Sequence, residues 1–369
     1  MPEIILEGPF SVTQQSPESL SRFYHFPSME KLSNGEIILC CKELEGGMND
    51  PGGRILLFRS ADNGKNWEQG VPPTIHDEEE FPGKGYMMAH VTELAPGELI
   101  AVYSLIDTDA SRPLFNPETD GAQPSRVRTV KSHDNGISWE EPRDIGFQSR
   151  DIIVPSRIIL LPDGSCGFPC EMHDHWEGGY EEGNCSRFIR SYDGGETFNE
   201  GNIMAASEGI LYGDARPTFI DDEVLVFFWT LDLKNMKDLP IHVVSTKDSA
   251  GSWSSPKPIN ITTQIMSPLY LGNNLMLAIH QDRFSGSPGI KALLSSDRGM
   301  NWDRATEVTL FGADNRPEGT NPFTEFDQFQ FGYSSLLKTG EDSCLASFWH
   351  REGDTTAVSV MGITINGES

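Results

Sequence analysis

Six times along the chain, an apolar run is followed by a short polar turn and a second apolar run. The six segments read FPSMEKLSNGEIILCCKE, HVTELAPGELIAVYSLID, VPSRIILLPDGSCGFPCEMH, ARPTFIDDEVLVFFWTLD, SPLYLGNNLMLAIHQDR and FGYSSLLKTGEDSCLASFWHRE. Most of the turns contain Gly, Asn or Asp, the residues that close tight β-hairpins. Each hairpin is followed by a third extended segment and usually by a fourth. The pattern therefore predicts six antiparallel sheets, most of them four-stranded.

A second repeat, Ser-x-Asp-x-Gly-x-x-Trp, falls between the third and fourth segments of most units. Clear copies are SADNGKNW, SHDNGISW and SSDRGMNW, and weaker copies are SYDGGETF and TKDSAGSW. In such a turn the carboxylate accepts hydrogen bonds from backbone N–H groups, the glycine adopts positive φ, and the aromatic ring packs beneath the loop. We therefore assign a structural role to Asp62, Asp134, Asp193 and Asp297.

Repeated sheets in one chain of 369 residues indicate an all-β, six-bladed β-propeller of four-stranded antiparallel blades. The last blade lacks the aspartate repeat, and its third strand, TTAVSVMGITI, is followed at once by the C-terminus. The N-terminal segment IILEGPF can supply the fourth strand, which would close the ring and remove an exposed sheet edge. No linker interrupts the series, so residues 1–369 are predicted to form one domain.

In such a ring, the first strand of each blade begins at the mouth of the channel where the second strand ends. Six of the nine histidines fall on these segments, at positions 25, 90, 173, 175, 280 and 350. Their clustering predicts a polar pocket that can move protons near neutral pH. Trp176, in the polar loop HDHWEGGYEEGN, is the candidate platform for a sugar ring. The histidines form no recognised metal motif, and we predict neither a metal site nor a cofactor.

The net charge of −27, from 55 acidic and 28 basic residues, limits the classes of partner. Such a field repels phosphate backbones and anionic bilayers, so we expect neither nucleic acid nor a membrane as a partner. The N-terminus MPEIILEGPF lacks the charged and apolar regions of a signal peptide. The expected location is the cytoplasm, or the periplasm or exterior if a leader has been removed. The sequence makes no prediction of the oligomeric state.

The aspartate repeats resemble those of the Asp-box, or bacterial neuraminidase repeat, propellers of the sialidase superfamily. QFGYSSLLKTGEDSCLASF is similar to the segment that holds the nucleophilic tyrosine of sialidases, which implies Tyr333 as the nucleophile or its remnant. NDPGGRILLFRS is similar to the loop that carries the general acid, which implies Asp50. Arg283 stands where the family places one of three arginines that bind the carboxylate of the sugar.

Other positions depart from the family pattern, so the resemblance is that of a divergent member. YHFP puts His25 where a second arginine is expected, and Asp232 stands near the position of the third. In GDARPTF, Asp214 replaces the glutamate that activates the tyrosine, and Arg216 is an addition. Losing two of the three arginines removes charge-assisted hydrogen bonds worth roughly 1.5–3 kcal/mol each, which argues against sialic acid as the substrate.

The leading hypothesis is an exo-acting glycoside hydrolase that removes a sugar, neutral or acidic, from the non-reducing end of a glycan. The candidate catalytic residues are Asp50, Tyr333 and Asp214. The candidate substrate-binding residues are His25, Arg283, Arg216, His90, His280, His173, Trp176 and Arg351. Two alternatives stay open: a lyase that acts on uronate polysaccharides with His, Tyr and Arg, and a noncatalytic carbohydrate-binding propeller.

Overall fold

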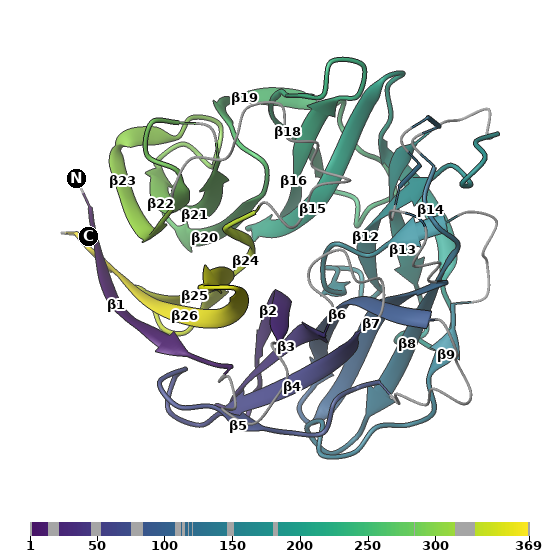
Figure 1. Cartoon of the computed structure of the whole chain (residues 1–369), viewed down its shortest axis with the longest axis horizontal. Coiled ribbons are helices and arrows are strands. Elements are labelled where there is room, and N and C mark those ends of the chain that lie inside the picture. The colour runs from purple at the N-terminus through teal and green to yellow at the C-terminus, as the bar shows by residue number, and fades with distance from the viewer. Residues whose placement is uncertain are drawn as a thin grey trace.

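The computed structural model describes residues 2–13, 22–45, 53–74, 84–107, 112, 115–116, 118–119, 121–145, 151–179, 184–283, 285–313 and 329–367. Within these residues every regular element is a β-strand, and no helix is long and apolar enough to cross a bilayer. The strands form six sheets arranged radially around a common axis (Figure 1). The predicted all-β, six-bladed propeller is confirmed.

The first three blades run in chain order from the inner to the outer strand. Blade one consists of β2 (Phe23–Lys31), β3 (Ile37–Leu44), β4 (Arg54–Ser60) and β5 (Glu68–Gln69). Blade two consists of β6 (Lys84–Ala95), β7 (Glu98–Asp107), β8 (Ser125–Ser132) and β9 (Arg143–Asp144). In blade three the inner strand is interrupted, so that β10 (Asp151–Ile153) and β11 (Ile159–Leu160) both pair with β12 (Cys166–His173), followed by β13 (Cys185–Ser191) and β14 (Asn199–Ala205).

The last three blades repeat this arrangement. Blade four consists of β15 (Ile210–Ile220), β16 (Glu223–Asp232), β18 (Pro240–Thr246) and β19 (Lys257–Thr262), with the short β17 (Lys237–Asp238) beside β16. Blade five consists of β20 (Met266–Gly272), β21 (Leu275–Asp282), β22 (Gly289–Ser295) and β23 (Asp303–Gly312). Blade six consists of β24 (Phe331–Lys338), β25 (Ser343–Glu352), β26 (Thr355–Asn366) and the N-terminal β1 (Glu3–Ser11).

The two ends of the chain close the ring. Strand β1 pairs antiparallel with β26, with Ile4 opposite Ile365, and the termini lie close together in Figure 1. The fourth strand of blade six therefore comes from the N-terminus, as predicted. This pairing covers the edge that β26 would otherwise expose.

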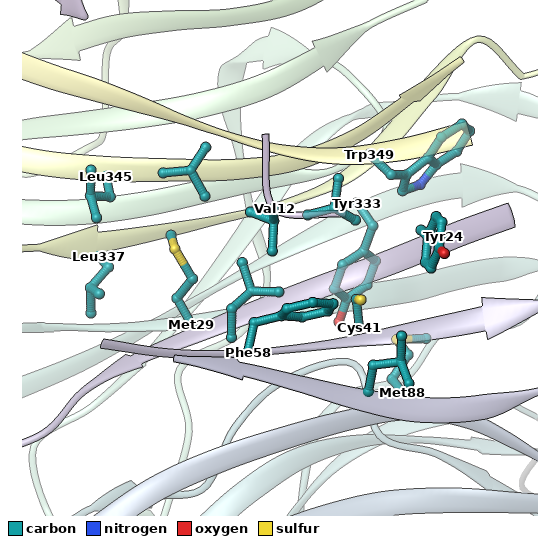
Figure 2. Packing of buried hydrophobic residues seen from close by; sticks show 14 of the residues in the cluster. Val12, Tyr24, Met29, Cys41, Phe58, Met88, Tyr333, Leu337, Leu345 and Trp349 are labelled. Atoms are coloured by element: carbon teal, nitrogen blue, oxygen red, sulfur yellow. The ribbon is translucent and has the colours of Figure 1, made fainter. Parts of the chain in front are cut away.

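Apolar side chains fill the spaces between neighbouring blades, one cluster at each of the six junctions. Figure 2 shows the junction of blades six and one, where Leu337 and Leu345 face Met29 and Phe58. A blade between two neighbours is covered on both faces, and for this reason all eight residues of β3 are buried. This double burial explains why the second strands read as continuous apolar runs in the sequence.

The five aspartate repeats form the same hydrogen-bonded turn between the third and fourth strands. Oδ1 of Asp62 accepts the backbone N–H of the residue four positions later at 2.9 Å, and the other four aspartates accept the equivalent N–H at 2.8–2.9 Å. Gly64 has a φ of 82°, which suits the glycine position of the repeat. Because the third strands run away from the mouth, these turns lie at the opposite end of the propeller from the candidate site, in keeping with a structural role.

Candidate active site

Four blades carry a β-bulge near the start of the first strand, at the mouth. The register shifts between His25 and Ser28, Tyr86 and Ala89, Gly213 and Arg216, and Gly332 and Ser335. Three residues inside these bulges, Phe26, Asp214 and Tyr333, have positive φ values of 55°, 50° and 33°. Positive φ is uncommon for residues other than glycine, and bulges change the direction of side chains. The bulges direct these three residues and Met87 to the lining of one cavity.

Blades four and six build their bulges with the same pair of residue types. Gly213 lies opposite Trp229, and Gly332 lies opposite Trp349, in each blade one position before the bulge residue. A Cβ atom on Gly332 would lie 2.7 Å from Nε1 of Trp349, whereas a Cβ on Gly213 would lie 3.4 Å from Cε3 of Trp229. Glycine is therefore required in blade six for the indole ring to pack against the strand.

The cavity reached by the bulge residues, here called the mouth cavity, has a volume of about 90 Å³. It lies at the end of the axis where the first strands begin and the second strands end. Its described polar lining consists of Glu171, Asp214, Gln264, Arg283 and Tyr333, and its aromatic walls include Phe26, Phe115, Trp229, Phe329 and Trp349. A few polar groups that converge in an aromatic cavity are typical of a binding site for a small molecule.

A second carboxyl group, that of Glu171 in β12, lies beside Asp214. The backbone N–H of Asp214 donates to Oε1 of Glu171, and Nε2 of His173 lies 3.4 Å from Oε2 of the same carboxylate. Burial raises the pKa of Asp214 to about 7; the neighbouring Arg216 opposes this rise and the charge of Glu171 adds to it. A carboxyl group that keeps its proton near neutral pH thus lies next to a second carboxyl group.

Tyr333 reaches across the axis and forms the floor of the mouth cavity. Its hydroxyl donates to the carbonyl oxygen of Pro155 and lies 3.3 Å from Nε2 of His90. This carbonyl lies in the interruption between β10 and β11. The guanidinium of Arg216 stacks on the phenol ring, with Cζ 4.4 Å from the ring centroid. Burial raises the pKa of the Tyr333 phenol well above its usual value, so the hydroxyl stays protonated.

Arg283, directly after β21, is the one cationic residue in the described lining of the mouth cavity. Its Nη2 donates to Oε1 of Gln281 at 2.9 Å. Its guanidinium stacks on Phe329 and Phe331, with Cζ 3.9 and 4.9 Å from the two ring centroids. These contacts fix the orientation of a charged donor group at the wall of the cavity.

Two of the predicted substrate-binding residues, Arg216 and His90, lie on the far side of the floor. They line a second cavity of about 270 Å³, here called the channel cavity, and Tyr333 is the one residue in the described lining of both cavities. Nη1 of Arg216 donates to the carbonyl oxygen of Pro155 at 2.6 Å, and Nδ1 of His90 lies 2.9 Å from Oγ of Ser28. Burial, with a smaller effect of Arg216, lowers the pKa of His90 to about 3. The structure therefore places both residues beneath the mouth cavity.

Two further histidines predicted at the site lie in the packed interior. Nε2 of His25 is 3.2 Å from Oγ1 of Thr356, and its ring centroid is 4.7 Å from that of Trp349. Nε2 of His280 is 3.2 Å from Oε2 of Glu307. Burial lowers the pKa of both histidines. Neither ring lines the mouth cavity, because each is enclosed by its own and the neighbouring strands.

The remaining predicted residues lie around the mouth cavity and outside its described lining. His173 packs against Phe115, which lines the cavity, and the two ring centroids are 5.0 Å apart. Trp176 is half-buried, with Cζ of Arg112 5.3 Å from its ring centroid. The backbone N–H of Arg351 donates to the carbonyl oxygen of residue 330 at 2.8 Å.

Asp50 lies outside the described residues, and its assignment as general acid stays a prediction. Of the predicted residues, the structure brings Asp214, Tyr333 and Arg283 together at the mouth cavity. The positions of Glu171, Trp229 and Trp349 in the hairpins place them at the mouth, although none of the three is among the site residues predicted from the sequence. All three lie in the second strand of a hairpin, near the end that reaches the mouth, as the strand-end rule that selected the histidines also indicates.

Solved structures with low sequence identity share this fold. A protein of unknown function from Dyadobacter fermentans has a TM-score of 0.75 at 16% identity, covering 99% of this chain and 100% of that one. The NanB sialidase of Streptococcus pneumoniae has a TM-score of 0.67 at 12% identity, covering 97% of this chain and 70% of that one. The α-L-arabinanase of Penicillium chrysogenum has a TM-score of 0.66 at 14% identity, covering 98% of each chain.

The sequence itself matches no protein-family model and no protein of curated function. The likeness to sialidases and to the arabinanase is therefore a likeness of fold. At that level the resemblance expected from the aspartate repeats is confirmed.

Proposed function

We propose that this protein is an exo-acting glycoside hydrolase in which Asp214 is the general acid and Glu171 is the second catalytic carboxylate. The carboxyl pair carries the proposal: a group whose pKa is raised to about 7 lies beside another carboxyl group in a small aromatic cavity. Most glycoside hydrolases use two carboxyl groups whose surroundings hold them in different protonation states. The sialidase and the arabinanase that share the fold support the same class of reaction.

Asp214 donates its proton to the glycosidic oxygen as the bond to the anomeric carbon breaks. Burial keeps this proton in place near neutral pH because a desolvated carboxylate is unfavourable. The positive φ of 50° and the hydrogen bond from its backbone N–H to Glu171 fix the direction of the side chain. The acid is thus held in position before the substrate binds.

Glu171 acts on the anomeric carbon, either as a nucleophile or as the base that activates water. A nucleophile gives retention of configuration through a covalent glycosyl-enzyme, and a base gives inversion in one step. His173, 3.4 Å from the carboxylate, orients it. Proton NMR of the anomeric configuration of the newly released sugar distinguishes the nucleophile from the base.

The walls of the mouth cavity suit a sugar ring. Trp229, whose Nε1 donates to Asp238 at 2.6 Å, and Trp349 provide aromatic surface, and Arg283 and Gln264 provide polar groups for hydroxyls or one carboxylate. A single cation favours a neutral or singly acidic sugar over one that needs three arginines. Arabinofuranosides and uronides are therefore favoured over sialosides as candidate substrates.

Tyr333 supports an exo mode of action because it closes the cavity from below. A terminal sugar fits such a closed pocket, whereas an internal sugar needs an open cleft. Its hydroxyl is bonded to Pro155 and its pKa is raised, so we assign Tyr333 to the floor of the pocket. The sialidase resemblance instead implies a nucleophilic Tyr333. The two assignments predict different activities for the Tyr333→Phe variant.

The test uses paired nitrophenyl and dinitrophenyl glycosides of arabinofuranose, N-acetylneuraminic acid, glucuronic acid and common hexoses. Turnover of at least one pair is expected. Asp214→Asn should lower kcat/KM on the nitrophenyl glycoside by roughly 10²–10⁴-fold, and by much less on the dinitrophenyl glycoside, whose leaving group needs no proton. Glu171→Gln should lower both rates.

Asp222→Asn is the matched control, because Asp222 is exposed in the hairpin turn of the same blade. This variant should keep the wild-type rates. Equal losses on both leaving groups in Asp214→Asn would remove the acid assignment. Glycan binding without turnover would indicate a binding propeller, and products that absorb in the ultraviolet would indicate a lyase.

A further inference from the structure

The channel cavity below Tyr333 differs in charge from the rest of the protein. Its described lining contains two cations, Arg157 and Arg216, and no acidic residue, although the chain has a net charge of −27. Hydroxyl groups of the same lining come from the inner strands of several blades and include Ser28, Ser156 and Ser334. A positive, hydroxyl-rich cavity on the axis of an acidic protein favours a negatively charged ligand.

Arg216 is buried, with 7% of its surface exposed, and its hydrogen bonds go to uncharged groups. Nη1 donates to the carbonyl oxygens of Pro155, Asp214 and Ala215 at 2.6, 3.2 and 3.3 Å. Nη2 has no hydrogen-bond acceptor among the described residues. The one described carboxylate oxygen within 4.0 Å of it is Oδ1 of Asp214, at 3.9 Å, which is beyond hydrogen-bond distance.

A second buried donor lines the same cavity. Ser334 is fully buried, and within the described part of the chain its Oγ has no hydrogen-bond partner. The neighbouring hydroxyls are occupied, since Oγ of Ser267 donates to the carbonyl oxygen of Ser334 at 2.7 Å and Ser28 pairs with His90. A guanidinium N–H and a hydroxyl without a described partner thus belong to residues that line the same cavity, and buried donors of this kind are rare in native proteins.

The remaining groups around Arg216 leave its charge without a full counter-charge. Arg157 is bound by Glu30, so this cation is already compensated. His90 and Tyr333 are uncharged near neutral pH, with the pKa of His90 lowered to about 3 and that of Tyr333 raised. Asp214 is largely protonated below its pKa of about 7. An isolated buried cation is unfavourable, and a bound anion relieves this cost.

We infer that the channel cavity is a binding site for a small monovalent anion, such as chloride, held by Nη2 of Arg216 and the hydroxyl of Ser334. One uncompensated cation matches one negative charge. A metal cation is disfavoured because the two arginines in the lining would repel it. This inference does not depend on the proposed hydrolase activity, because the mouth cavity shares only Tyr333 with this site in the described residues.

The test is the linewidth of the ³⁵Cl NMR signal with the full chain at constant ionic strength and pH 6. The wild-type protein should broaden the signal, and unlabelled bromide should reverse the broadening. Arg216→Met should reduce the broadening at least tenfold, and Ser334→Ala should reduce it several-fold. The control is Arg126→Met, which removes the same charge from a side chain that is 56% exposed on another strand. It should keep the wild-type broadening.

Equal broadening by wild type and Arg216→Met, or the same loss in Arg126→Met, would overturn the inference. Because Arg216 packs on Tyr333, near-ultraviolet circular dichroism must show that Arg216→Met is folded. The wild-type protein provides a test without substitution: crystals soaked in bromide should show an anomalous peak within hydrogen-bond distance of Nη2 of Arg216. Bromide peaks at the surface with none in the channel cavity would contradict the site.

Discussion

Blades four and six place a side chain at the mouth by the same backbone arrangement, yet the two side chains end in different surroundings. In each blade a glycine opposite a tryptophan precedes a bulge residue with positive φ. Asp214 is short and stays within the mouth cavity beside Glu171, whereas Tyr333 is long and reaches Pro155 across the axis. The backbone therefore sets the direction of each side chain, and the length of the side chain decides whether it stays within the mouth cavity or forms its floor.

Blade three provides the partners for both side chains. Its interrupted inner strand presents the carbonyl oxygen of Pro155, which accepts hydrogen bonds from Tyr333 and Arg216. Its second strand, β12, carries Glu171, which accepts the backbone N–H of Asp214. A regular inner strand would engage this carbonyl in the sheet, so the interruption is part of the construction of the site.

The largest expected effect concerns the acid of blade four. With Asp214 as the proposed general acid, kcat/KM of the wild-type protein on a nitrophenyl glycoside should fall about tenfold per pH unit above about 7, because the acid must be protonated to act. Asp214→Asn should lower the rate by roughly 10²–10⁴-fold and remove this limb of the profile. Survival of the limb in Asp214→Asn would show that another group is the acid.

The same substitution should change the pH dependence of stability. Burial raises the pKa of Asp214, so the contribution of its protonated form is present at pH 4 and is lost as the pH rises through about 7. Relative to wild type, Asp214→Asn should gain up to about 4 kcal/mol of unfolding free energy between pH 4 and pH 8. Urea unfolding at both pH values measures this difference, and a difference independent of pH would contradict the raised pKa.

The two glycines should differ in their tolerance of a methyl group. Gly332→Ala should destabilise the protein by about 1–3 kcal/mol, because the new Cβ would lie 2.7 Å from Trp349. Gly213→Ala should cost about 1 kcal/mol or less, because its Cβ would lie 3.3 Å or more from its neighbours. Urea unfolding of both variants makes the comparison, and equal costs would show that the two bulges are packed alike.

The smallest effect on activity is expected for the floor of blade six. Tyr333→Phe keeps the ring and removes the hydroxyl bonded to Pro155, so activity should stay within about tenfold of wild type while the unfolding free energy falls by about 1–3 kcal/mol. The measurement is turnover alongside urea unfolding. A loss of three orders of magnitude in kcat without loss of fold would instead identify Tyr333 as the nucleophile.

The sequence predicted the fold because each unit repeats its own local signals, such as the turn of the aspartate repeat and the two apolar runs. It also placed Asp214, Arg283 and Tyr333 at the same mouth, since the ends of the strands follow from the hairpins. It did not predict the bulges, because these first strands are largely buried on both faces and lack the regular apolar–polar alternation that a one-residue change of register would interrupt. For this reason Arg216 was expected at the mouth and lies beneath the floor.

The histidines illustrate a second limit. Their clustering at the strand ends suggested a proton-transfer site, but His25 and His280 are buried against Thr356 and Glu307. Position along a strand does not tell whether a side chain faces the axis or the neighbouring blade. In contrast, the apolar surroundings that raise the pKa of Asp214 come from several blades, and no local motif encodes them.

The most direct test is an NMR titration of the side-chain carboxyl carbon of Asp214 in ¹³C-labelled protein, with the signal assigned by its loss in Asp214→Asn. The titration requires no knowledge of the substrate. We predict a midpoint near pH 7, which is the pKa that a buried acid beside Glu171 should have. A midpoint near 4, the usual value of an exposed aspartate, would contradict the account of blade four as the source of the catalytic proton.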